Sequence, residues 1–337
     1  MKEKRFIKIF ILTAASIVAC VFFISGVLLA ADTVTLRVAH NFPVKHPYST
    51  ACDMLAKEVK EKTNGKVIFK HFPGGQLGTG SQIFDQAVKG TIDLTPSGPT
   101  AAGKYYDPMN SLQVFYLVDS PQQLLKIMEG PIGQKLFEQC RLKTGLKILP
   151  SILYYGRRSI LTANKPIYKP EDLKGLKLRS MTSAFMKKCV QSMGATAVPI
   201  PMGELYMALQ TGVVDGLENT PVTITLQKWY EVAKYYSLTG HSIHPSLWNF
   251  NGKSWQNKVP DYAKPIILEA VKHVTEWEID EMLKREGVAL KELEQKGLKV
   301  IEVDRDIFRK AVQQIYPELE KRFGPVFKGI TQAAAQM

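Results

Sequence analysis

The sequence predicts an α/β fold, in which strands and helices alternate along most of the chain. Short runs with a period of two are each followed by an amphipathic helical segment, and glycine or asparagine ends several of these segments. One unusually long helical pattern follows near the C-terminus. Alternating strands and helices are typical of layered α/β structures. A chain of 337 residues also exceeds the usual size of a single domain, so two domains are expected.

The first half of the chain shows this alternation clearly. The predicted elements are a strand at 34–39, a helix at 49–62, strands at 66–72 and 92–94 around a helix near 81–89, a helix that begins near Ser120, and a long strand at 146–155. Side chains alternate in polarity along the strands, whereas apolar residues recur every three or four positions in the helices. Asn64 and Gly65 supply the stop signal of the first helix.

The second half continues the pattern and then changes. The predicted elements are a strand at 176–179, helices at 183–193 and 203–210, a short strand at 213–215, and a helix from Pro221 toward Lys234. A long helix is then expected at 261–286, because Ile267, Val271 and Val274 share one face. A short helix, a strand at 298–303 and a final helix at 306–323 complete the prediction.

Residues 1–31 have the pattern of a cleavable secretory signal peptide. A basic start with Lys2, Lys4, Arg5 and Lys8 precedes an apolar run from Ile9 to Leu29 and two small residues, Ala30 and Ala31. The apolar run is long enough to span a bilayer, so an uncleaved anchor is one alternative. A lipoprotein box at 17–20 is another, although the apolar residues after it argue against a polar tether. We predict export to the periplasm.

Charge and cysteine content exclude several classes of protein. The leader contains four basic residues and one acidic residue, so its removal lowers the formal charge from +13 to +10. Lysines are spread along the chain without an arginine-rich patch, which favours a basic solvated surface over nucleic-acid binding. Cys52, Cys140 and Cys189 cannot form a disulfide framework and lack metal-ligand spacing. We expect buried free thiols, with one bridged pair as the alternative.

Polar side chains follow several of the predicted strands. Open α/β sheets bind ligands beyond the carboxyl ends of their strands, where loops meet helix N-termini. The residues at such positions are Asn41, Ser97, Gly98, Tyr154 to Arg158, Arg179, Ser180, Thr182, Asn219 and Thr220. Arginines, amides and hydroxyls dominate this set and acids are few. The sequence therefore predicts a site for an anion.

Arg179 is the strongest candidate within this set. Leu176 and Leu178 share one face of their strand, so Arg179 points to the other face, near the start of the next helix. A guanidinium there can bind a carboxylate through two parallel hydrogen bonds, and the helix dipole also favours an anion. The alternative is an ordinary ion pair with a nearby acid.

Catalytic and metal-binding interpretations have weaker support. The glycine-rich segment 74–80 fits neither dinucleotide nor P-loop spacing and is interpreted as a turn with a helix cap. His241 and His244 could hold a metal, but Pro245 follows and no third ligand is evident, so a histidine pair in a loop is expected. Glu204 and Asp215 could form an acid/base pair, but capping or bracing of the backbone is favoured.

Aromatic residues supply candidates for an apolar wall. Tyr154 and Tyr155 end one predicted strand, and Trp248 and Phe250 lie in a second aromatic segment. They could belong to the core, but at least one of them is expected to face a ligand, since small-molecule sites are mostly apolar with few polar anchors. These aromatic residues favour an acid with an apolar or aromatic body.

Two segments resemble the DctP-type substrate-binding proteins of TRAP (tripartite ATP-independent periplasmic) transporters. They are Leu-Lys-Gly-Leu-Lys-Leu-Arg at 173–179 and the stretch from Pro199 to Asn219 that contains Gly-Glu-Leu-Tyr and Val-Val-Asp-Gly-Leu-Glu-Asn. Supporting motifs are Phe-Pro-Gly-Gly-Gln-Leu-Gly at 72–78, Gly-Thr-Ile-Asp at 90–93 and Gly-Arg-Arg at 156–158. The resemblance covers essentially the whole chain after the leader.

The resemblance implies a two-lobed periplasmic binding protein fold with crossing strands and a long helix that spans both lobes. We expect one lobe at 32–155 plus 245–286 and the other at 156–244 plus 287–337. The residues that it implies for ligand binding are Arg179 for the carboxylate, Arg158 as second arginine, Asn219, Asn41, and Met202 in place of a usual aromatic. Gly98 stands where sialic-acid-binding members carry an acid, which argues against a sialic acid ligand.

The sequence therefore predicts a solute-binding protein that captures a small organic acid and delivers it to a TRAP permease. Its predicted ligand-binding residues are Arg179, Arg158, Asn219, Asn41, Met202, Trp248, Tyr154 and Ser97. We expect a monomer without catalytic residues, metal or cofactor, and no nucleic-acid partner. The alternatives are a secreted hydrolase or lyase and a ligand sensor on a similar two-lobed fold.

Overall fold

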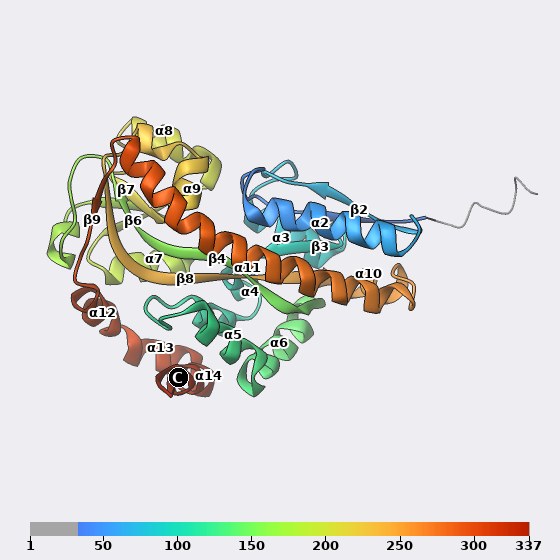
Figure 1. Ribbon diagram of the computed structural model, residues 1–337. Coiled ribbons are helices and arrows are strands. Elements are labelled where there is room, and N and C mark those ends of the chain that lie inside the picture. The colour runs from blue at the N-terminus through green and yellow to red at the C-terminus, as the bar shows by residue number, and fades with distance from the viewer. Residues whose placement is uncertain (1–32, 337) are drawn as a thin grey trace, which may run out of the picture.

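The computed structural model describes residues 33–336 as one mixed sheet with helices on both faces (Figure 1). Its strands are β1 (Val34–Ala39), β2 (Val67–Phe72), β3 (Leu94–Ser97), β4 (Leu146–Thr162), β5 (Lys177–Ser180), β6 (Thr196–Pro199), β7 (Gly216–Asn219), β8 (Tyr235–Asn251) and β9 (Lys299–Ile301). The α-helices are α2 (Pro47–Lys62), α3 (Gly80–Lys89), α4 (Pro99–Gly103), α5 (Pro121–Glu129), α6 (Pro131–Thr144), α7 (Ala184–Ser192), α8 (Leu205–Gln210), α9 (Pro221–Leu226), α10 (Gly252–Asn257), α11 (Ala263–Gln295), α12 (Arg305–Gln313), α13 (Tyr316–Phe323) and α14 (Pro325–Ala335). Short 3-10 helices lie at Asp107–Gln113 (η1), Pro170–Leu173 (η2), Met202–Glu204 (η3) and Trp229–Glu231 (η4). None of the helices in residues 33–336 is both long and apolar enough to cross a membrane. The predicted signal peptide lies outside the described residues.

The sheet joins two parallel groups of strands through one antiparallel pair. Its strand order is β2-β1-β3-β8-β4-β7-β5-β6, and β9 pairs with β8 outside this path. Strands β1, β2 and β3 are mutually parallel, as are β5, β6 and β7. Between them, β8 and β4 run antiparallel to each other along most of their length. The carboxyl ends of the two parallel groups therefore face each other across β4 and β8.

The two central strands are unusually long and belong to both groups. Each of them has 17 residues. The end of β8 pairs with β3, whereas the end of β4 pairs with β7. The register between them shifts from Tyr154–Pro245 to Gly156–His244, and Gly156 has a φ of 112°, which favours glycine. This shift lies at the expected boundaries near 155 and 245, although the assignment of residues to lobes stays a prediction.

Helix α11 crosses the molecule from α10 to the region of α8 and α9 (Figure 1). It packs against α2, which lies beside the group of β1, β2 and β3, against β4, and against α9, which follows β7 of the other group. Glu278 and Glu286 on this helix accept hydrogen bonds from the backbone N–H groups of Tyr154 (3.0 Å) and Arg157 (2.6 Å). The helix is thereby attached to β4 on both sides of the register shift.

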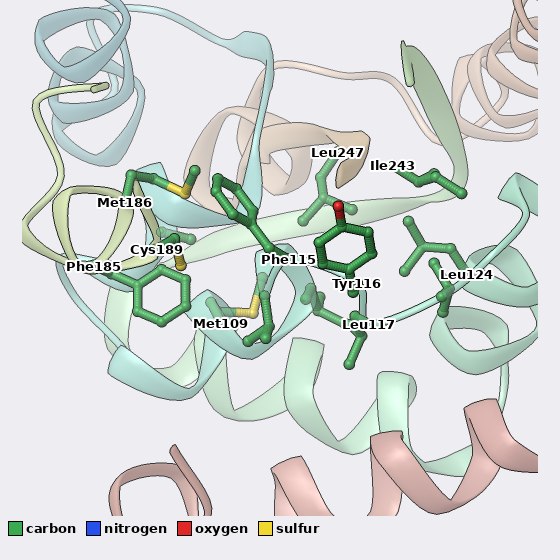
Figure 2. Packing of buried hydrophobic residues seen from close by; sticks show 14 of the residues in the cluster. Met109, Phe115, Tyr116, Leu117, Leu124, Phe185, Met186, Cys189, Ile243 and Leu247 are labelled. Carbon is green, nitrogen blue, oxygen red and sulfur yellow. The ribbon is translucent and has the colours of Figure 1, made fainter. Parts of the chain in front are cut away.

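The apolar core holds the segment 109–118 against both β8 and α7. Figure 2 shows Phe115 of this segment between Met186 of α7 and Leu247 of β8, and Tyr116 beside Leu247 on the side of Leu124. The C-terminal helix α14 packs beneath the same layer, against η1, α5 and α6. Close apolar packing of this kind resists rearrangement, because a shift of these side chains would leave cavities.

Most of the elements expected from the sequence are present, with several differences. Helix α9 ends at Leu226 rather than near Lys234, and α11 continues to Gln295 through the short helix that was expected after 286. Strand β8 was not predicted, because nearly all of its residues are buried and it therefore lacks alternation. The strand expected at 213–215 lies at Gly216–Asn219 instead. The expected final helix is divided into α12 and α13, with a proline in the first turn of α13. Cys52, Cys140 and Cys189 are buried free thiols, as expected.

Two glycine substitutions should have opposite effects on stability. At Gly216 in β7 an added Cβ would lie 2.4 Å from the carbonyl oxygen of Leu161, so Gly216→Ala should lower the free energy of unfolding by about 1–3 kcal/mol. At Gly287 in α11 an added Cβ would meet no described atom within 4 Å beyond the backbone of its own helix, so Gly287→Ala should raise the free energy of unfolding by about 0.5–1 kcal/mol. Urea denaturation followed by circular dichroism measures both, and equal effects would contradict the packing described here.

Candidate functional site

A cavity of about 940 Å³ lies where the two strand groups face each other. One wall comes from the loops after β1 and β3 and from the turn before α3. The opposite wall comes from the segment between β5 and α7 and from residues 201–204. Tyr155 and Arg158 of β4 and His244 of β8 line it between these walls. The central strands therefore form its floor.

The cavity brings together five of the eight residues expected to bind ligand. Asn41, Ser97, Arg158, Arg179 and Met202 all line it. Asn219 lies directly behind Arg158, whereas Tyr154 and Trp248 lie elsewhere. The set thus converges from β1, β3, β4 and β5 and from η3, as expected for residues at strand ends.

Arg179 is buried and has no acidic partner among the described residues. Its Nε donates to the carbonyl oxygen of Ile200 at 2.8 Å, and its other guanidinium nitrogens donate to no described residue. Only 3% of the side chain is exposed. Burial lowers the pKa of Arg179 to about 10; Glu218 opposes this shift and Arg158 adds to it. The guanidinium is therefore a cation at neutral pH with free donors on a cavity wall.

An acidic partner was one alternative for Arg179, but the structure places such a partner, Glu218, beside Arg158 instead. Nε and Nη2 of Arg158 donate to both carboxylate oxygens of Glu218, and Nη2 also donates to the Glu218 carbonyl oxygen at 2.7 Å. Burial alone would raise the pKa of the Glu218 carboxyl, but the charge of Arg158 and hydrogen bonds from His241 and Arg158 hold it well below its usual range. The two residues form a buried, charged pair.

Asn219 continues this hydrogen-bond network. Its Oδ1 accepts from Nη1 of Arg158 at 3.4 Å and from the backbone N–H of Thr220 at 2.9 Å. Its Nδ2 is buried and has no hydrogen-bond partner among the described residues. Because a buried donor without a partner costs free energy, this amide is available to a ligand or to a rearranged neighbour.

Tyr154 and Trp248 do not line the cavity. The hydroxyl of Tyr154 donates to Glu286 of α11, and Nε1 of Trp248 donates to Thr275 of the same helix, each at 2.9 Å. Both side chains are directed toward α11 and serve packing. The neighbouring Tyr155 lines the cavity instead, because successive side chains of a strand point to opposite faces. Phe250 is also in the core. Of the four aromatic candidates, Tyr155 lines the cavity, as was expected for at least one of them, and the apolar or aromatic body of the ligand stays a prediction.

The two histidines of the weak metal motif lie in strand β8, which corrects their expected place in a loop. His241 is 3.4 Å from Glu218 and 2.8 Å from Thr239, outside the cavity. His244 lines the cavity and contacts Gln113. Pro245 is accommodated within the strand, next to the register shift.

The expected acid/base pair is not brought together. Asp215 accepts a hydrogen bond from the backbone N–H of Lys177 at 2.7 Å, which is the bracing role expected for it. Glu204 lines the cavity within η3, but Asp215 does not. The geometry therefore does not bring Glu204 and Asp215 together at the cavity.

In the part of the chain that the structure describes, one group of side chains has metal-like spacing: His40, Cys52 and His71. Nδ1 of His40 accepts the backbone N–H of Phe42, so in the neutral ring the hydrogen is on Nε2. That nitrogen lies 2.9 Å from Nε2 of His71, whose Nδ1 is 2.7 Å from Asp53. With these donor and acceptor roles, Nε2 of His40 donates to Nε2 of His71, and Nδ1 of His71 donates to Asp53.

Three residues of functional interest were not selected from the sequence as ligand-binding residues: His244, which lines the cavity, and Glu218 and Gln113, which contact lining residues from behind. Glu218 lies in the stretch that was used as a family motif, but the motif was not interpreted as carrying a buried acid. His244 was considered only as a metal ligand. Gln113 gives no local signal, because its contact with His244 joins residues 131 positions apart.

Comparison with known proteins agrees with this geometry. Residues 38–322 match the model of the DctP family, bacterial extracellular solute-binding protein family 7. A solute-binding protein of Chromohalobacter salexigens is 31% identical over 311 residues, covering 88% of this chain and 91% of its own. A TRAP periplasmic solute-binding protein of Actinobacillus succinogenes, solved with L-galactonate, superposes with a TM-score of 0.84 at 28% identity and covers 90% of this chain and all of its own. One from Sulfurospirillum deleyianum, solved with succinate, has a TM-score of 0.82 at 28% identity and covers 88% and 97%.

The cavity between the two strand groups is lined by Arg158 and Arg179. This arrangement is that of a solute-binding protein, the class to which the similar solved structures belong. The family model covers most of the chain, so the protein belongs to the DctP family of bacterial extracellular solute-binding proteins.

Neutralising Glu218 should destabilise the protein more than neutralising an exposed acid. Glu218→Gln leaves Arg158 buried without a countercharge, so the free energy of unfolding should fall by about 3–5 kcal/mol near pH 7. Asp261→Asn is the control, because Asp261 forms an exposed ion pair with Lys264 and should leave stability unchanged. Urea denaturation distinguishes the two variants.

The same substitution should change the acid dependence of stability. The folded-state pKa of Glu218 is depressed, so its contribution is present above the unfolded-state value of about 4.3 and is lost as the pH falls toward the folded-state value. Glu218→Gln should therefore show a shallower loss of stability below about pH 5 than the wild type. Identical acid profiles for the two proteins would contradict a charged Glu218.

Proposed function

We propose that this protein captures a small organic anion in its central cavity and delivers it to a TRAP permease without altering it. The observation that carries the proposal is the free guanidinium of Arg179, buried on the cavity wall without an acidic partner among the described residues. An unpaired buried charge is costly, so such a residue is best explained by a partner that arrives from outside.

The balance of buried charge supports an anionic ligand. Arg158 and Arg179 both line the cavity, and Glu218 compensates the first of them. Among the buried charges that line the cavity in the described part of the chain, one positive charge is left for the ligand. A carboxylate can take two parallel hydrogen bonds from a guanidinium, which gives orientation as well as affinity.

The beginning of helix α7 adds to this attraction. Thr182, Ser183 and Ala184 line the cavity beside Arg179, and within residues 33–336 no side chain caps the first turn of α7. Its N–H groups and the positive end of its dipole therefore favour an anion in the same place.

Closure of the two lobes would complete the binding site. We propose lobes at 32–155 plus 245–286 and at 156–244 plus 287–337, which meet at the register shift between β4 and β8. Arg158 has five N–H donors, of which one on Nη1 is unused by its described partners, and Nδ2 of Asn219 is also free. Exclusion of water on closure would strengthen each of these contacts.

The relatives support a carboxylate as the recognised group. The solved structures from A. succinogenes and S. deleyianum hold L-galactonate and succinate, which share a carboxylate but differ in size and hydroxylation. A common fold with different ligands is consistent with an arginine that binds the carboxylate and other residues that contact the rest of the ligand. Membership of a family of extracellular solute-binding proteins also supports the periplasm as the place of action.

Removing the guanidinium of Arg179 should abolish most of the affinity for organic acids. Arg179→Ala should weaken binding by about 2–5 kcal/mol, or roughly thirtyfold to several thousandfold, because a charged partner is lost. Arg179→Lys should also bind weakly, since an ammonium cannot make two parallel hydrogen bonds. Titration calorimetry with succinate and galactonate measures these effects.

The matched control is Arg141→Ala, which removes an exposed arginine paired with Glu138 and should leave affinity unchanged. Wild-type affinity in both Arg179 variants would reject Arg179 as the anion-binding residue. Mass spectrometry of the acid after long incubation tests the alternative of a hydrolase or lyase, which requires turnover rather than recovery of the intact acid.

A further inference from the structure

A second polar group of the cavity lies on strand β8 and has a hydrogen-bonding pattern of its own. His244 lines the cavity with 5% of its side chain exposed. Its ring meets the ring of Tyr155 edge-on, with 5.4 Å between centroids. Tyr155 in turn lies under the guanidinium of Arg158 at 5.6 Å. The histidine is therefore part of the same cavity floor as Arg158, but it is contributed by β8 rather than β4.

The amide of Gln113 determines which hydrogen bonds His244 can make. The backbone N–H of Thr100 donates to Oε1 of Gln113 at 3.0 Å, so the other end of the amide is the NH2 group. That Nε2 lies 2.7 Å from the ring nitrogens of His244. Since an amide NH2 only donates, one ring nitrogen of His244 must accept.

The other ring nitrogen is a donor without an acceptor. Burial lowers the pKa of His244 to about 3, and Arg158 adds to this shift, so the ring is neutral at physiological pH and carries one hydrogen. Gln113 is its only hydrogen-bond partner among the described residues, and the Gln113 NH2 group cannot accept. Both ring nitrogens lie 2.7 Å from the same NH2 group, so the N–H of either tautomer contacts a donor and has no acceptor within this part of the chain.

Gly98 keeps the nitrogen edge of this ring open. A Cβ at this position would lie 2.9 Å from Nε2 of His244 and 3.2 Å from Nε2 of Gln113. The φ of Gly98 is −66°, which any residue adopts, so the backbone does not require glycine here. Space beside His244 is the physical reason for it.

We propose that His244 is a specificity-determining residue, whose single N–H donates to an oxygen on the body of the ligand while Arg179 holds its carboxylate. The ligand class is then an oxygen-substituted organic acid, with a hydroxyl, keto or second carboxylate oxygen. An ammonium group has no lone pair to accept this hydrogen, and a methylene group leaves it unsatisfied. The proposal rests on the proposed function, because it assumes an anion at Arg179.

Paired acids that differ in oxygen substitution test this selectivity. The probes are butyrate against succinate, butyrate against 3-hydroxybutyrate, and hexanoate against gluconate, each titrated by calorimetry. In at least one pair the wild type should bind the more oxygenated acid roughly 5- to 150-fold more tightly, which corresponds to one donor left unsatisfied by the other acid.

Variants at His244 connect this selectivity to the ring N–H. His244→Phe keeps a ring beside Tyr155 but removes the donor, so the affinity ratio within the pair should fall toward one. His244→Gln restores a donor and should recover part of the ratio. Gly98→Ala should lower the ratio by crowding the nitrogen edge. His273→Phe, at a half-exposed histidine near Glu58, is the control and should keep the wild-type ratio.

The outcomes separate this inference from the proposed function. If Arg179→Ala weakens both acids of a pair and His244→Phe leaves their ratio unchanged, the role of His244 is wrong and anion capture stands. If Arg179→Ala has no effect, the proposed function fails. Wild-type protein that binds the less oxygenated acids equally well, or that binds none of the oxygenated acids, overturns the inference directly. Circular dichroism of each variant checks that it has folded.

Discussion

The antiparallel pairing of β4 and β8 is the interaction on which the arrangement of the site depends. Each strand pairs with one parallel group at one end and with its partner strand along the rest of its length. The carboxyl ends of the parallel strands consequently meet above these two strands, and the polar residues that follow them converge there. The register shift near Gly156 bends the pairing at this place, and Glu278 and Glu286 attach α11 to β4 beside it. Strands that are shared by two halves can transmit a relative movement without breaking either half.

The two buried arginines differ in whether their charge is compensated. Glu218 is one strand away from Arg158 and binds it through both carboxylate oxygens, which makes Arg158 a fixed part of the cavity floor. Arg179 is held through one nitrogen by the carbonyl oxygen of Ile200, which orients the guanidinium without neutralising its charge. A backbone carbonyl can position a cation while leaving its remaining donors free. The site is therefore rigid at one arginine and unsatisfied at the other, which suits reversible capture better than chemistry.

Local patterns were sufficient for elements whose two faces differ in polarity. Strand β1 lies at the expected residues, and Arg179 lies at the end of β5 as its leucines indicated, because alternation reports which face is buried. The same logic failed for β8, where both faces are buried, and for Trp248, whose side chain points to the α11 side of the sheet. For Arg179 the sequence allowed either a ligand or an acidic partner, and the acid is used by Arg158 instead.

The sequence by itself determined the alternation of strands and helices, the long helix, and the kind of side chain available at strand ends, because these depend on neighbours within a few positions. Only the tertiary structure decided which of those side chains meet. The contacts of Gln113 with His244 and of Arg158 with Glu218 join residues 131 and 60 positions apart. Their pairing follows from strand order and register, which a local pattern does not contain. Which arginine stays free for a ligand is a property of that register.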